Sequence, residues 1–152
     1  MKISNSGRSS ALLSTHEEKV LSALQNLPSQ YKVVSSPRLK FPTEQVSYEP
    51  DFVVQREDGS RLVVEVKSQH SLSMNNLSQL TRISALIRKE GQGFVVMVFG
   101  PTEEWSPTWK LDEFNELHVR TVMNKEDIVR QTLQEFNELP PLSTATHSIN
   151  DR

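Results

Sequence analysis

Two acidic residues and one lysine stand in the most apolar part of this sequence. The segment YEPDFVVQREDGSRLVVEVKSQ, residues 48–69, places Asp51 directly before one apolar run, and Glu65 and Lys67 inside the next. Burying a charge without a partner is expensive, so these positions need an explanation. Two carboxylates brought together repel one another and attract a cation, and Mg²⁺ and Mn²⁺ prefer oxygen ligands. A neighbouring lysine can hold a metal-bound water and steady the charge on a phosphate, which completes the parts needed to hydrolyse a phosphodiester.

The two apolar runs predict a β-hairpin that brings these side chains together. Asp58-Gly59 between them is favourable turn chemistry, because both residues tolerate a positive φ. Side chains alternate between the faces of a strand, so Glu65 and Lys67 share one face. In a paired hairpin, Asp51 comes close to one of them. An ordinary solvated sheet face with cross-strand ion pairs would show the same pattern, and the residues alone leave both interpretations open.

The remaining elements predict one α/β domain with a mixed sheet. Residues 1–13 are expected to be a loose arm, residues 14–139 the single domain, and residues 140–152 a flexible tail. The apolar periodicity and the capping residues predict the order α-β-β-β-α-β-β-α. Helices are expected at 16–27, 73–89 and 125–136, and strands at 31–34, 51–55, 61–67, 94–99 and 116–122. The stretch between the first two strands reads as a connection punctuated by Pro37 and Pro42.

Composition narrows the class of protein. The 152 residues suit a single soluble domain, and the absence of cysteine removes disulfides, thiolate metal sites and cysteine nucleophiles. No stretch is apolar enough to span a membrane, and the first residues lack a signal core, so we expect a cytoplasmic protein without a membrane partner. The net charge is −2, which is unfavourable for binding nucleic acid. The charge is uneven, however: residues 1–95 carry 12 basic and 9 acidic residues, and residues 96–152 carry 5 and 10.

Pro50-Asp51, the short hairpin and Glu65-Val66-Lys67 together resemble the PD-(D/E)XK nuclease superfamily, which has the restriction-endonuclease-like fold. The resemblance covers roughly residues 15 to 100, in the order helix, three strands, helix and a further strand. Within the superfamily, the segment is similar to transposon-encoded endonuclease subunits and small resolvase-like nucleases. The resemblance implies a Mg²⁺- or Mn²⁺-dependent endonuclease that acts on DNA.

The resemblance also implies roles for particular residues. Asp51 and Glu65 would be metal ligands, the carbonyl of Val66 a further ligand, and Lys67 the residue that positions the attacking water. Many members carry a glutamate on the first helix. Glu17 and Glu18 are the candidates, and we favour Glu17 because it shares the stripe of the helix that faces inward.

Further candidates and a second function stay open. Gln79, Arg82 and His70 are weaker candidates for contacts with DNA, since a solvated helix face and an incidental loop histidine are the more ordinary explanations. Because one active site cuts one strand, we expect a homodimer or a protein partner. The alternative function is a catalytically weak or inactive subunit of this fold that binds DNA or a protein, which the acidic residues 96–152 favour.

Overall fold

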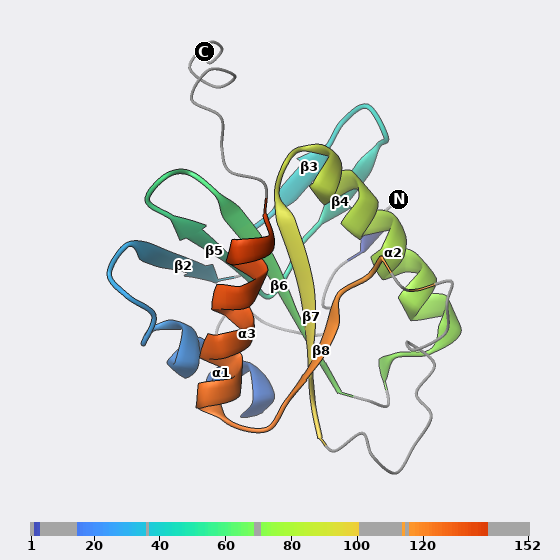
Figure 1. The fold of residues 1–152 in the computed structure, drawn as a ribbon. Coiled ribbons are helices and arrows are strands. Elements are labelled where there is room, and N and C mark those ends of the chain that lie inside the picture. Colours follow the sequence, from blue (N-terminus) through green and yellow to red (C-terminus); the bar gives the residue numbers. More distant parts are fainter. Residues whose placement is uncertain are drawn as a thin grey trace.

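A five-stranded mixed sheet forms the centre of the protein, with helices on both faces (Figure 1). In this computed structural model, residues 2–3, 15–35, 37–68, 71–100, 114 and 116–139 are described. The elements are β1 (Lys2–Ile3), α1 (Thr15–Leu24), β2 (Tyr31–Ser35), β3 (Leu39–Phe41), β4 (Val46–Tyr48), β5 (Phe52–Arg56), β6 (Arg61–Ser68), α2 (Met74–Lys89), β7 (Gly93–Phe99), β8 (Val119–Val122) and α3 (Lys125–Glu138).

The central sheet has the order β2-β5-β6-β7-β8. The first three strands in this order are antiparallel to their neighbours, and a short turn joins β5 to β6. β6, β7 and β8 are parallel, and α2 makes the crossover from β6 to β7 that a parallel pair requires. Gly59 has a φ of 96° in the β5–β6 turn, the conformation for which glycine is favoured. The predicted hairpin and the α/β class with a mixed sheet are therefore confirmed, and the arrangement is consistent with a restriction-endonuclease-like core.

The two faces of the sheet carry two separate hydrophobic cores. One core joins α2 to the sheet and to the short strands β3 and β4, and the other joins α1 and α3 to the opposite face. In Figure 1, α1 and α3 lie together on one side of the sheet, and α2 lies on the other. β7 is buried along almost its whole length, as its unbroken apolar sequence predicts for a strand covered on both faces. Among the described helices, none has the length and apolar character to cross a membrane.

The prediction that a plain connection joins the first two strands of the central sheet is wrong, because this stretch contains two strands of a second sheet. β3 and β4 form a hairpin that turns through residues 42–45, where Gln45 has a φ of 57°. β1 adds to β4 in parallel, which gives the order β1-β4-β3. Strands of two or three residues are too short to show a period of two, and the pairing of Lys2–Ile3 with β4 joins segments far apart in the sequence. Residues 2–3 of the expected loose arm are thus a strand, and residues 4–14 lie outside the described part.

The other predicted elements differ from the observed ones at their ends. The strand expected at 116–122 begins only at Val119, because Leu117 lies in a turn, where its amide donates to the carbonyl of Phe114. Asn124 caps α3 as expected, by accepting a hydrogen bond from the amide of Asp127. The expected tail at 140–152 lies outside the described residues.

Candidate active site

The β5–β6 hairpin places Asp51 opposite Glu65. The strand register pairs Phe52 with Val64, so the next position outward pairs the two acidic residues. Directly opposite residues of an antiparallel pair share a face, and their side chains are close. Both carboxylates are only 1% exposed. The hairpin therefore buries two like charges side by side, an arrangement that opposes folding unless a cation or a proton intervenes.

The backbone and two side chains hold these carboxylates in place. The amide of Val66 donates to Asp51 Oδ2 at 2.7 Å, so the backbone of β6 lies directly beside this carboxylate. Glu65 is held at both oxygens: the hydroxyl of Tyr48 donates to Oε1, and Lys67 Nζ lies 3.2 Å from Oε2. The side chain of Lys67 is 23% exposed, whereas Glu65 is buried, so the lysine stands between the carboxylates and solvent.

A third acidic side chain reaches the same place from α1. Glu17 is 7% exposed and forms a side-chain hydrogen bond with Asp51, whereas Glu18 is exposed. Val20 and Leu24 follow Glu17 by three and seven residues and are fully buried, so all three lie on the inward stripe of the helix. The placement of Glu17 inside and Glu18 outside agrees with the helical periodicity of the sequence.

The electrostatics of the group favour a bound cation. Burial, the charge of Glu65 and the hydrogen bond with Glu17 together raise the pKa of Asp51 to about 9, against the donated amide of Val66, which lowers it. A neutral Asp51 can share its proton with Glu17 at pH 7. Three acidic side chains with a single lysine beside them form a hard oxygen donor set that fits Mg²⁺ or Mn²⁺, which would replace the shared proton.

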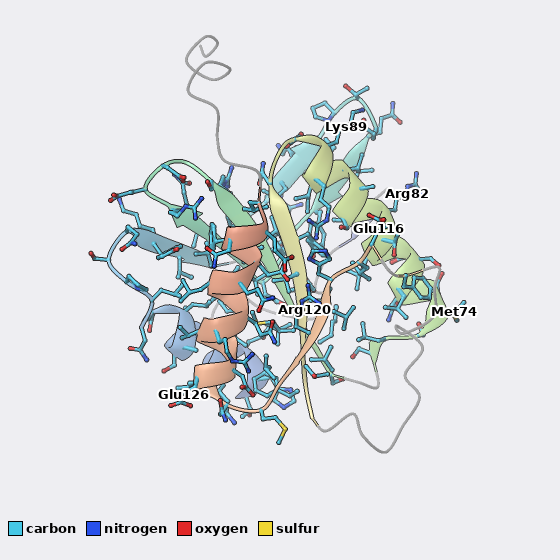
Figure 2. All side chains as sticks on the ribbon, in the orientation of Figure 1. Met74, Arg82, Lys89, Glu116, Arg120 and Glu126 are labelled. Atoms are coloured by element: carbon cyan, nitrogen blue, oxygen red, sulfur yellow. The ribbon has the colours of Figure 1, made fainter. Side chains whose placement is uncertain are left out.

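Two of the three weaker candidates for contacts with DNA, Arg82 and Gln79, lie on α2. Arg82 is exposed and extends from α2 away from the central sheet (Figure 2), and Gln79 is half-buried on the same helix. The buried face of α2, which includes Leu80 and Ile83, packs on the sheet. Arg82 is thus on the opposite side of the helix from the core. His70 lies outside the described residues.

Sequence reasoning missed Tyr48. Its ring is buried beside Phe94, with ring centroids 6.3 Å apart, and its hydroxyl ends at Glu65. The sequence carried one signal, since Tyr48 precedes Asp51 by only three residues. β4 lies in the stretch expected to be a connection, and its three residues are too few to show the alternation of a strand.

A second charged cluster joins β8 to α3. Glu135 is 2% exposed; its Oε2 accepts from Arg120 Nε at 2.9 Å, and its Oε1 lies 2.8 Å from His118 Nδ1. Figure 2 shows Arg120 at β8 beside α3. Burial opposes ionisation of Glu135, but the bonds with His118 and Arg120 outweigh it and lower the pKa. Ligand atoms of His118, Glu135 and Glu138 lie within 4.8 Å of one another, yet the two basic partners already occupy both oxygens of Glu135. This cluster is an ion-pair link between two elements.

The comparisons with known proteins are sparse. No family model matches the chain, and no curated protein matches it. One solved structure is similar, described as "Structure of EndoMS-dsDNA2 complex", with 17% identity and a TM-score of 0.45. The similar region covers 74% of this chain and 46% of that chain, so this chain corresponds to about half of the other. The α/β class with a mixed sheet follows from the strand order of this protein.

Proposed function

We propose that the protein is a metal-dependent deoxyribonuclease, an endonuclease that hydrolyses phosphodiester bonds of DNA. The observation that carries the proposal is the buried pair of Asp51, directly before β5, and Glu65, on β6, with Lys67 at 3.2 Å from Glu65. A hairpin selected only for stability would place apolar residues here, because replacing buried charges by apolar side chains is often neutral or stabilising. We therefore infer that the buried charges serve catalysis rather than stability.

The proposed roles follow from the position of each residue. Asp51 and Glu65 would hold Mg²⁺ or Mn²⁺, the carbonyl of Val66 would be a further ligand, and Glu17 would complete the acidic group through Asp51. A metal held there would supply a lowered pKa for water and a positive charge beside the phosphate. Lys67, at the exposed side, donates a hydrogen bond to the attacking water and to a phosphate oxygen. The water attacks phosphorus and releases a proton to solvent, the bond to the 3′-oxygen breaks, and this oxygen takes up a proton from solvent, so the products carry a 5′-phosphate and a 3′-hydroxyl.

Cleavage of both strands of a DNA duplex requires two active sites. One group of Asp51, Glu65 and Lys67 cuts one strand, so cleavage of a duplex on both strands requires two copies or a protein partner. We propose DNA as substrate and a homodimer or a heteromeric assembly as the active form. Gln79, Arg82 and His70 remain weak candidates for contacts with DNA.

The alternative function is a subunit of this fold that binds DNA or protein and cuts weakly or not at all. The acidic excess of residues 96–152 and the net charge of −2 favour it, because a nuclease acting alone gains from a basic groove. Binding of DNA without metal-dependent cleavage would support this alternative.

A cleavage assay tests the proposal. Purified protein is incubated with supercoiled, linear and branched DNA in the presence of Mg²⁺, Mn²⁺ or EDTA. We expect cleavage only with a divalent metal, and we expect Asp51→Asn and Lys67→Ala to abolish it. Glu57→Gln is the matched control, because Glu57 is exposed in the turn of the same hairpin and should be dispensable. Cleavage that persists in EDTA, or survives both site substitutions, would refute the proposed mechanism.

A further inference from the structure

The small sheet β1-β4-β3 touches the acidic group through one side chain. Tyr48 is the last residue of β4, where it pairs with Leu39 of β3 and with Ile3 of β1. Its side chain is 1% exposed and belongs to the core on the α2 side of the sheet. Backbone pairing on both sides and the packed ring therefore leave the hydroxyl of Tyr48 a single direction, toward Glu65.

The carboxylate of Glu65 contacts two donors, a neutral hydroxyl and a charged amine. The Tyr48 hydroxyl donates to Oε1, and Lys67 Nζ lies beside Oε2. A carboxylate on a strand can rotate about its terminal bond unless its oxygens are held, because that torsion is broad. Lys67 alone does not fix it, since a flexible and partly exposed amine can move with the carboxylate. The buried phenol is rigid, and it is neutral, so it orients Glu65 without repelling a cation held by the same carboxylate.

We infer that Tyr48 is a positioning residue, which fixes the carboxylate of Glu65 in the orientation that binds the divalent metal. This inference rests on the proposed function and adds a residue from outside the hairpin to the site. Hydrogen-bond partners that orient metal ligands commonly contribute 10–100-fold in metal affinity or activity. A merely structural tyrosine would also need a partner for its buried hydroxyl, so the test must separate the two roles.

Tyr48→Phe removes the hydroxyl and keeps the ring. The matched control is Tyr31→Phe, because Tyr31 is the other tyrosine of the chain, packs against Phe136 in the second core, and hydrogen bonds to Arg56 rather than to the acidic group. For wild type and both variants, Mn²⁺ binding is titrated by calorimetry, and the cleavage rate is measured as a function of Mn²⁺ concentration. In EDTA, binding of a short duplex is measured as a readout that does not depend on the metal.

We expect Tyr48→Phe to raise the Mn²⁺ concentration at half-saturation by about 10–100-fold. The cleavage rate should recover toward wild type at saturating Mn²⁺, and duplex binding in EDTA should not change. Tyr31→Phe should leave half-saturation at the wild-type value. In metal-free protein, a slowly exchanging hydroxyl proton should be visible by proton NMR and should disappear in Tyr48→Phe.

The outcomes separate this inference from the proposed function. A wild type that binds Mn²⁺, together with a Tyr48→Phe protein of the same affinity, overturns the role of Tyr48 and leaves the nuclease proposal standing. An equal loss of affinity in Tyr31→Phe also overturns it, because the effect would then follow general stability. A wild type that binds no Mn²⁺, with or without a short uncleavable duplex, overturns the proposed function and the role of Tyr48 together.

Discussion

Replacing Asp51 by asparagine should stabilise the metal-free protein. Asparagine keeps the shape of the side chain, and its oxygen can still accept from the amide of Val66. Its amide can donate to Glu17 in place of the shared proton. The substitution removes only the ionisable group, which the folded protein holds in its unfavourable neutral state beside Glu65.

The magnitude follows from the pKa of Asp51 in the two states. The pKa is 3.8 as the ordinary value and about 9 in the folded protein, raised by burial, by the charge of Glu65 and by the hydrogen bond with Glu17. Between these values the folded protein binds more protons than the unfolded chain, so the stability of the wild type falls as the pH rises through this window. At pH 7 the folded protein has lost the stability that corresponds to the interval between the unfolded pKa of 3.8 and the pH. Because one pKa unit is about 1.4 kcal/mol, this loss is about 4 kcal/mol.

Urea unfolding followed by circular dichroism in EDTA measures this difference. Asp51→Asn should be more stable than wild type by about 4 kcal/mol at pH 7, and the gap should close as the pH falls below the unfolded pKa of 3.8, where Asp51 is protonated in both states. Asp58→Asn is a control of opposite sign, because hydrogen bonds from Arg56 and from the amide of Ser60 lower the pKa of Asp58 to about 2. Because Asp58 is exposed, the Asp58→Asn protein should be only slightly less stable than wild type at pH 7. A less stable Asp51→Asn protein at pH 7, or a gap independent of pH, would refute the reasoning.

Three further predictions concern single residues. Lys67→Ala should stop cleavage yet leave Mn²⁺ binding largely intact in a calorimetric titration, because the lysine is not a ligand; a lost metal site would contradict its assigned role. Glu17→Gln should weaken metal-dependent cleavage and Glu18→Gln should not, since only Glu17 reaches Asp51; equal rates for the two variants in the plasmid assay would remove Glu17 from the site. Glu135→Gln should destabilise the protein by about 1–3 kcal/mol at pH 7. Because the folded pKa of Glu135 is lowered, its contribution is present above the unfolded pKa and is lost as the pH falls through the folded value, so urea curves for this variant and wild type should converge in acid.

The sequence was sufficient for the parts of the site that depend on local structure. Strand alternation and a glycine turn predicted that Asp51 lies close to Glu65 or Lys67, because the hairpin joins neighbouring segments, and the observed register places it opposite Glu65. Glu17 could be distinguished from Glu18 because a helix has a fixed period and Val20 marks its inward stripe. These predictions concern placement, and the roles of the residues in metal binding and catalysis remain proposals.

The parts that could not be predicted depend on contacts between distant segments. Tyr48 lies on a strand of three residues, whose partners are another such strand and two residues at the start of the chain. No periodicity is visible over such lengths. Glu135 and His118 each look like surface residues of an amphipathic element, and only the packing of α3 beside β8 buries one against the other. Charge pairs of this kind carry no signal in a single sequence.

The central claim is that Asp51 and Glu65 hold a divalent metal for phosphodiester hydrolysis. The most direct test is a crystal grown with a short uncleavable duplex and Mn²⁺, with data collected at a wavelength where manganese scatters anomalously. We predict an anomalous peak within ligand distance of both carboxylates, with a DNA phosphate on the same side as Lys67. A duplex bound with no peak at these carboxylates, or a peak only at His118, Glu135 and Glu138, would contradict the proposed metal site.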